Sequence, residues 1–185
     1  MAATHELIEA VTCPAGGSTT TLEFSSIPAT FTDLEVVWSL KYDSSNYTVP
    51  AHGQCYWKVN GSSTTSVYPH AYQGMWHASG NSLWYYGSSP WFEMQVGIAR
   101  ADTDTSNCGR FMIYDYTATS TTGKSIQAMN SNMEYSANNY DRAMISTSGN
   151  LNIAAAISSL AVTCYGSGVI KEDSYMRLYG IDRTA

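Results

Sequence analysis

The chain has 185 residues, of which 44% are hydrophobic and 13% are charged, and its formal net charge is −6. Its 9 lysines and arginines are scattered along the sequence, so direct nucleic-acid binding, which needs a concentrated basic patch, is not expected. No apolar run approaches the roughly 18 residues of a membrane-spanning helix, and the N-terminal residues lack the positive and apolar regions of a signal peptide.

Strand-like runs alternate with turn residues along the chain. The clearest run is Leu34–Tyr42, where every second residue from Leu34 onward is apolar or aromatic and the residues between them are mostly polar. This period of two is typical of a half-buried strand. In chain order, the predicted strands are His5–Thr12, Thr21–Phe24, Leu34–Tyr42, Gln54–Val59, Thr65–Gln73, Leu83–Tyr86, Trp91–Ile98, Arg110–Tyr116, Lys124–Ala128, Ala143–Ser146, Ser159–Cys164 and Tyr175–Ile181.

The turns between these strands indicate an all-β fold. Asn60-Gly61 predicts a two-residue hairpin turn, because both positions tolerate a positive φ. Helix is nearly absent, and only the loop Leu151–Ile157 is expected to contain a helical turn. The sequence shows no linker and no repeat, so residues 1–185 are predicted to form a single domain. We expect a jelly-roll-like, two-sheet antiparallel sandwich.

The cysteines indicate neither a disulfide framework nor a metal site. Their spacing is wide, and the near-neighbour ligand pairs that zinc sites favour are missing. Without a secretion signal they are expected to be free thiols, formed in a reducing cytosol. No metal and no cofactor are predicted. The four residues are Cys13, Cys55, Cys108 and Cys164.

No motif predicts an enzyme. The sequence lacks the Gly-x-Ser-x-Gly pattern of a hydrolase nucleophile. His70 and His77 could approach each other across a hairpin, but no carboxylate is placed beside them, and all four histidines are interpreted as polar turn or edge residues. The other two histidines are His5 and His52.

Acidic residues offer two further patterns, and both have simpler explanations. Glu93 and Asp115 could form the carboxylate pair of a glycosidase, although any β-sandwich provides such pairs by chance. Asp102–Asn107 resembles the start of a calcium loop but lacks the glycine and the later glutamate of an EF-hand. These residues are expected to form turns.

The most unusual segment is Tyr68–Phe92, which is rich in aromatic residues. They could fill the core between two sheets, or they could form an exposed patch that contacts another protein or stacks on sugar rings. Because a strand cannot turn three consecutive side chains to one face, Trp84–Tyr86 cannot all be buried against one sheet. The candidate interface residues are Tyr68, Tyr72, Trp76, Trp84, Tyr85, Tyr86 and Trp91.

Five short blocks of sequence carry a resemblance to a known family. The chain resembles a family of small virion structural proteins of tailed bacteriophages, especially those of cyanophages and their relatives. The aromatic segment and the cysteines depart from the family pattern. The matching blocks are Leu7-Ile8, Phe24, Ser26-Ile27-Pro28, Thr30–Leu34 and Leu178–Ile181.

The resemblance implies a capsid decoration (cement) protein with a jelly-roll-like sandwich. Such a protein is made in the host cytoplasm and lies on the outer surface of the capsid. Its expected partners are the major capsid protein and copies of itself, as a dimer or trimer, with no nucleic acid and no membrane. The acidic charge of the chain is expected to complement basic patches on the shell.

Two alternatives to this role are considered. The first is a receptor-binding module of a phage tail or head fibre, whose aromatic residues bind host surface glycan. A fibre tip usually needs a shaft or attachment region in the same chain, and none is predicted here. A glycan-active enzyme is not favoured, for the reasons given above. The closing residues Asp182–Ala185 are a candidate arm that reaches a neighbouring subunit, although short chain ends are usually frayed.

Overall fold

The computed structural model describes the backbone of residues 4–43, 54–62, 70–77, 81–87, 92–95, 107–136, 139–164 and 168–183. Side chains are described for residues 4–43, 55–62, 107–131, 148–164 and 168–183. Within these ranges the chain forms strands and no helix. The strands are β1 (Thr4–Thr12), β2 (Ser18–Thr19), β3 (Thr21–Phe24), β4 (Asp33–Leu40), β5 (Tyr42–Asp43), β6 (Gln54–Val59), β7 (His70–His77), β8 (Asn81–Gly87), β9 (Phe92–Gln95), β10 (Asn107–Tyr114), β11 (Lys124–Ser136), β12 (Asn139–Leu151), β13 (Leu160–Cys164), β14 (Val169–Lys171) and β15 (Tyr175–Asp182).

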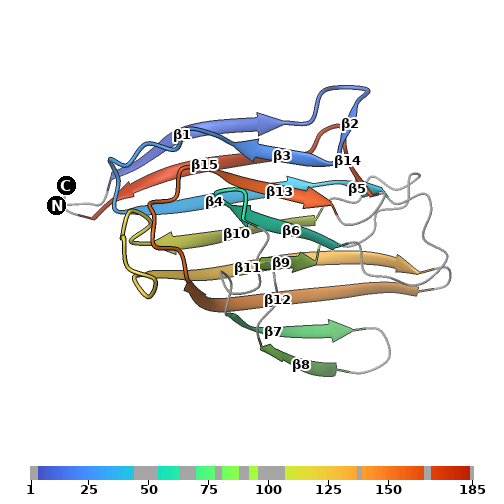
Figure 1. Cartoon of the computed structure of the whole chain (residues 1–185). Helices are drawn as coiled ribbons and strands as arrows, with labels where there is room; N and C mark the ends of the chain where they lie inside the picture. Colours follow the sequence, from blue (N-terminus) through green and yellow to red (C-terminus); the bar gives the residue numbers. More distant parts are fainter. Residues whose placement is uncertain are drawn as a thin grey trace.

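The strands form two main antiparallel sheets (Figure 1). The large sheet has 8 strands in the order β1-β15-β4-β10-β11-β12-β7-β8, and the small sheet has 4 strands in the order β3-β13-β6-β9. A third sheet of 3 short strands, β2-β14-β5, closes one end of the molecule. The predicted all-β fold with antiparallel sheets is confirmed, and its sheet order is compatible with a jelly roll.

Aromatic contacts join the two main sheets. Trp57 of β6 lies with its ring centroid 5.9 Å from Trp38 of β4 and 4.7 Å from Phe111 of β10, in edge-on geometry. All three residues are at most 1% exposed. The alternation predicts that every second residue of β4, from Leu34 to Leu40, points inward. These residues are buried as expected. The core therefore lies between the inner faces of the large and small sheets.

A glycine makes room for the central tryptophan. Gly109 pairs with Trp38 across β10 and β4. A Cβ atom at position 109 would lie 2.3 Å from Cζ2 of Trp38 and 2.7 Å from the Cβ of Asn130. Real Cβ atoms do not approach other atoms so closely, so the indole ring can occupy this place because the side chain of residue 109 is a hydrogen.

Strand boundaries differ from the prediction where polar residues continue a strand. The ranges of β3 and β6 match the prediction. The strands β11 and β12 each extend to 13 residues, because Ser, Asn and Thr continue their pairing beyond the apolar runs. The predicted strand Leu34–Tyr42 is divided at Lys41, and Tyr42 begins β5 of the third sheet. The strand predicted at Thr65–Gln73 overlaps β7 from His70 onward, and residues 65–69 lie outside the described part of the chain. The strands β2 and β14 were not predicted.

The turn at Asn60-Gly61 is observed, but it does not close a hairpin. Asn60 and Gly61 have φ values of 50° and 67°, as predicted. The partners of β6 are β13 and β9, which come from distant parts of the sequence. Asn60 also organises the loop before β13, because its Oδ1 accepts hydrogen bonds from the N–H groups of Ser158 (2.8 Å) and Ser159 (3.2 Å).

The helical turn predicted within Leu151–Ile157 is not formed. Leu151 is the last residue of β12, and the following residues form an irregular loop. The N–H of Ile157 donates to the carbonyl oxygen of Tyr116 (3.0 Å), and the carbonyl oxygen of Ala156 accepts from Nδ2 of Asn60 (2.9 Å). These tertiary hydrogen bonds satisfy backbone groups that a helical turn would otherwise pair within itself.

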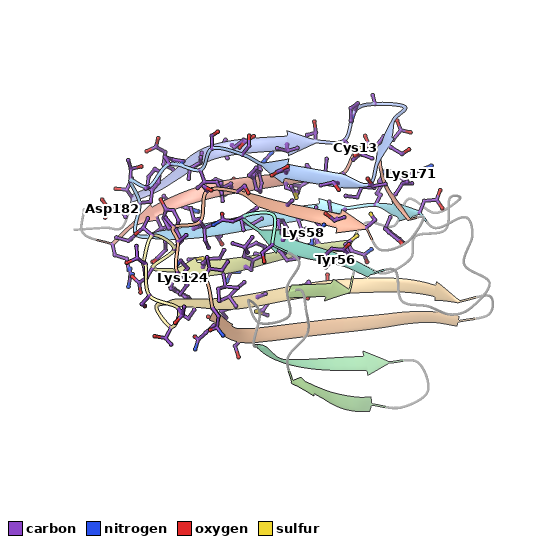
Figure 2. The ribbon with its side chains drawn as sticks, viewed as in Figure 1. Cys13, Tyr56, Lys58, Lys124, Lys171 and Asp182 are labelled. Carbon is purple, nitrogen blue, oxygen red and sulfur yellow. The ribbon has the colours of Figure 1, made fainter. Side chains whose placement is uncertain are left out.

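A buried lysine binds the loop that follows β12 (Figure 2). Lys124, the first residue of β11, is fully buried, and its ammonium group donates to the carbonyl oxygens of Ala118 and Ile153, the latter at 2.7 Å. Burial lowers the pKa of this ammonium. One ammonium group therefore provides the hydrogen-bond donor for two loop carbonyl oxygens.

The Thr30–Leu34 and Leu178–Ile181 blocks meet in space. Asp33 and Leu34 of β4 pair directly with Ile181 and Gly180 of β15. The backbone N–H and the Oγ1 of Thr32 both donate to the carbonyl oxygen of Ile181, at 2.9 and 2.7 Å. We call the group formed by Thr32, Asp33, Asp115 and Arg183 the terminal clamp.

Arg183 completes the terminal clamp. Its Nε lies 2.9 Å from Oδ2 of Asp33, which is 2% exposed, and its Nη2 contacts Oδ1 of Asp115. The N–H of Asp115 donates to the other oxygen of Asp33 (3.0 Å). Asp182 belongs to β15 and Arg183 is bonded to Asp33 and Asp115, so these two residues form neither the frayed end that was expected nor the candidate arm. Its last two residues, Thr184 and Ala185, lie outside the described part of the chain.

The Gly180→Ala variant should be less stable than the natural chain by about 1–3 kcal/mol. A Cβ atom at position 180 would lie 2.3 Å from the Phe31 ring, so the ring or β15 must move. Urea unfolding measures the loss. Adding Phe31→Ala should recover part of it in a double-mutant cycle, and strict additivity of the two changes would contradict the proposed steric cause.

The Asp33→Asn variant should lose about 1–3 kcal/mol of stability, because it weakens charge-assisted hydrogen bonds to a buried carboxylate. Asp173→Asn is the matched control. Asp173 pairs with Lys41 at 2.9 Å, but its side chain is 73% exposed, so its loss should stay within about 0.5 kcal/mol. Equal losses in thermal unfolding would show that the terminal clamp does not anchor the end of the chain.

Candidate interaction face

The structure separates His70 and His77, which could have approached each other across a hairpin. His70 and His77 are the first and last residues of β7, so they lie at opposite ends of one extended strand, about 23 Å apart along it. His52 lies outside the described residues. His5 is exposed on β1, where its ring centroid lies 4.6 Å from that of Tyr179.

The two acidic residues that were considered for a glycosidase pair are not on the same sheet. Glu93 belongs to β9 of the small sheet, whereas Asp115 follows β10 of the large sheet and contacts Arg183. Asn107 begins β10 and is buried, and residues 102–106 lie outside the described part of the chain. Among the residues that the structure describes, no three His, Cys, Asp or Glu side chains are grouped to hold a metal ion. The described residues include no helix long and apolar enough to cross a membrane.

The cysteines are free thiols, and three of the four are buried. Cys55 and Cys164 are cross-strand partners in the small sheet, and their sulfur atoms are 3.6 Å apart, a contact between two thiols. The hydrogen bond with Cys164, together with burial, raises the pKa of the Cys55 thiol well above its usual value. Burial likewise raises the pKa of the Cys13 thiol. Cys108 is exposed on β10.

The described part of the aromatic segment forms the edge strands β7 and β8 of the large sheet and the first residue of β9 in the small sheet. Tyr72 and Trp76 belong to β7, and Trp84, Tyr85 and Tyr86 belong to β8, the outermost strand. The register pairs Tyr72 with Tyr86. Tyr68 and Trp91 lie outside the described residues.

The large sheet has a second face that points away from the small sheet, and we call its part on β1, β15, β4, β10 and β11 the outer face. On β4 every second residue from Leu34 to Leu40 points into the core, so Glu35, Val37 and Ser39 between them point outward. The register places Tyr179, Arg177 and Tyr175 of β15 beside these three residues. It places Met112, Arg110 and Cys108 of β10 on their other side.

Three large hydrophobic residues in the described part of the chain are exposed, and all three lie on the outer face. Leu7 is 50% exposed, Met129 is 48% exposed and Tyr175 is 36% exposed. Leu7 pairs with Tyr179, and Met129 pairs with Arg110. Single exposed apolar residues are common on any protein. These three share one face of one sheet but lie on β1, β15 and β11, with other side chains between them.

Glu35 anchors the centre of the outer face. Its carboxylate lies 2.9 Å from Nε2 of His5 and 3.6 Å from Nη1 of Arg110, and its side chain is only 10% exposed. It thereby links β1, β4 and β10. The Arg110 side chain is 66% exposed, so its guanidinium group is held from one side and presented to solvent on the other.

The outer face mixes residue types. Its Tyr, Met and Arg residues are of types enriched at the centres of protein contacts, whereas Ser39, Ser131 and Glu35 are of types depleted there. Among the described residues, none of the lysines belongs to the outer face: Lys41 and Lys171 lie near the third sheet, Lys58 lies on β6, and Lys124 is buried.

Sequence reasoning did not select the residues of the outer face. The available signal was the alternation of Leu34–Tyr42, which assigns Glu35, Val37 and Ser39 to the side of the strand opposite the core. The neighbours of these residues come from positions 5–12, 108–112 and 175–179, and only the sheet register brings them together.

No protein-family model matches the chain, and no curated protein matches it.

The native protein should present one rapidly reactive thiol to a water-soluble disulfide reagent such as DTNB. Cys108 is exposed, whereas Cys13, Cys55 and Cys164 are at most 5% exposed. Thiolates are the reacting species, and the raised pKa of the Cys13 and Cys55 thiols further slows their reaction. The absorbance at 412 nm should correspond to about one reacted thiol per chain before unfolding and to all four after it.

In the same assay, Cys108→Ser should remove the rapid phase. Rapid reaction of more than one thiol in the native chain would contradict the buried placement of the Cys55–Cys164 pair.

Proposed function

We propose that the chain is a phage capsid decoration protein, which binds the outer surface of the shell and stabilises it by bridging neighbouring capsid subunits. The observation that supports this role most directly is the outer face, an extended open sheet surface of Tyr, Met and Arg with three exposed apolar side chains. A second support is the resemblance of its terminal sequence blocks to small virion proteins.

The clamped ends give the resemblance a physical basis. The Thr30–Leu34 block and the Leu178–Ile181 block pair with each other, and Gly180 leaves room for the ring of Phe31. These residues belong to the framework of the sandwich, while the proposed contact surface is carried by residues on the outside of that framework.

The mechanism of stabilisation is mechanical. A protein that binds the assembled lattice, and not its dissociated subunits, stabilises the lattice by linkage in proportion to RT ln(1 + [L]/Kd). Repeated binding at symmetric positions, or binding by an oligomer of this chain, adds the contribution of many modest contacts through avidity.

The second candidate function is a receptor-binding module of a tail or head fibre. The observation in its favour is the aromatic strand pair β7 and β8 at the edge of the large sheet, where Tyr72 pairs with Tyr86. Aromatic rings on such an edge could stack on host surface sugars. The apolar and arginine-containing surface of the outer face has no part in this second role.

The two functions are distinguished by mixing the purified chain with mature phage shells that have been stripped of it. A decoration protein should bind the shells to saturation and raise the temperature at which they open, measured by light scattering and by release of DNA. Shells mixed with the heat-unfolded chain provide the control. No binding to shells, together with strong binding on an array of host lipopolysaccharide glycans, would support the fibre role.

A further inference from the structure

We propose that the outer face docks on a carboxylate-bearing surface of a different protein, with Arg110 and Arg177 as its ionic anchors. The inference rests on the proposed function, in which that protein is the shell subunit, and it names the surface and the chemistry of the contact.

The two arginines form one row with an apolar residue between them. Arg177 of β15 and Arg110 of β10 both pair with Val37 of β4, so they flank it on the outer face. Neighbouring strands are about 4.8 Å apart, which places the two arginine backbones about 10 Å from each other. Met129 extends the row on the far side of Arg110.

Both guanidinium groups have a contact on their own face before any partner binds. The guanidinium carbon of Arg177 lies 5.4 Å from the centroid of the Tyr175 ring, and Arg110 contacts the carboxylate of Glu35. An arginine that is already oriented loses less conformational entropy when it binds. Its planar fork can then form two parallel hydrogen bonds with a carboxylate.

The charge of this row is opposite to the charge of the chain. The formal net charge is −6, yet the two carboxylates on the outward side of β4 are already paired: Glu35 with His5 and Arg110, and Asp33 with Arg183. Arg177 is the cation of the row that pairs with no carboxylate among the described residues. The overall charge suggested that the protein meets basic patches on the shell. The outer face instead complements acidic groups, so the partner surface is expected to carry Asp or Glu side chains.

Three other occupants of the outer face are less compatible with these observations. In a two-fold dimer formed face to face, the arginine rows would meet each other, and Glu35 is already bonded. Two cations are too few for a nucleic-acid backbone, where binding proteins typically make about 6–10 phosphate contacts. Leu7 and Met129 are aliphatic, and the exposed ring of Tyr175 is already stacked by Arg177 at 5.4 Å, so the face offers little ring surface for sugars.

The experiment compares charge reversal on the two sides of the molecule. Arg177→Glu changes the outer face, and Lys58→Glu is its matched control, because Lys58 lies 5.4 Å from the ring centroid of Tyr56 on the small sheet (Figure 2). Both changes replace a cation above a tyrosine ring by a carboxylate. Stripped shells are titrated with each protein at low and high salt, and circular dichroism confirms that each variant is folded.

We expect Arg177→Glu to raise the Kd for shells by about tenfold or more at low salt, and Arg110→Glu/Arg177→Glu to raise it further. Lys58→Glu should bind like the natural chain. The difference between the two single variants should shrink at high salt, because ions screen exposed charges. Equal effects of Arg177→Glu and Lys58→Glu would overturn the inference and leave the proposed function in place.

A second measurement does not depend on charge variants. A maleimide-linked polyethylene glycol attached to Cys108, which lies two residues from Arg110 on the same face, should block binding to shells, and the treated Cys108→Ser protein should bind normally. Unchanged binding of the labelled chain would overturn the inference.

The remaining outcomes separate the inference from the proposed function. If the natural chain does not bind stripped shells at all, the proposed function fails and the inference fails with it. If the natural chain is a dimer that Arg177→Glu dissociates while shell binding is unchanged, the occupant of the outer face is a second copy. That result would contradict the inference and keep the decoration role.

Discussion

The packing of Trp57 against Trp38 and Phe111 is the contact on which the rest of the molecule depends. It joins the two main sheets, and replacing any one of these side chains by alanine would be expected to remove about 3–5 kcal/mol. The contact also decides which surface remains open. Because the small sheet covers the inner face of β4 and β10, the residues that alternate with the core point outward on the large sheet. The surface proposed for binding is thus a direct result of how the core is built.

The interior and the end of the molecule are stabilised in different ways. The centre is apolar and closely packed, with Gly109 leaving space for the indole ring of Trp38. The terminal clamp is instead ionic, since Asp33 is buried and is held by Arg183 and by the N–H of Asp115. A buried ion pair contributes little net stability compared with an apolar contact of the same volume, but it tolerates few alternative arrangements. Its position beside the last strand is consistent with a role in fixing the register of β15 against β4.

Local patterns predicted much of the fold and little of the candidate site. The period-two alternation located β3, β4 and β6 closely, because burial on one face of a strand leaves a clear signal in neighbouring residues. It underestimated β11 and β12, whose small polar residues continue to pair without an apolar face. It could not place Arg110 beside Arg177, since these residues are distant in sequence and are joined only through Val37. The aromatic segment was prominent in the sequence because of its composition, whereas the outer face has no single prominent segment.

The pairing of β1 with β15 has a practical consequence for engineering. Thr4 lies opposite Asp182, so the two ends of the described chain leave the large sheet from adjacent antiparallel strands at the same end of the molecule (Figure 1). The arginine row crosses the sheet further along these strands, at Arg177. Peptides or proteins genetically fused to either end would therefore project side by side from one end of the sandwich. This geometry suits the chain as a scaffold for the paired display of two different cargoes.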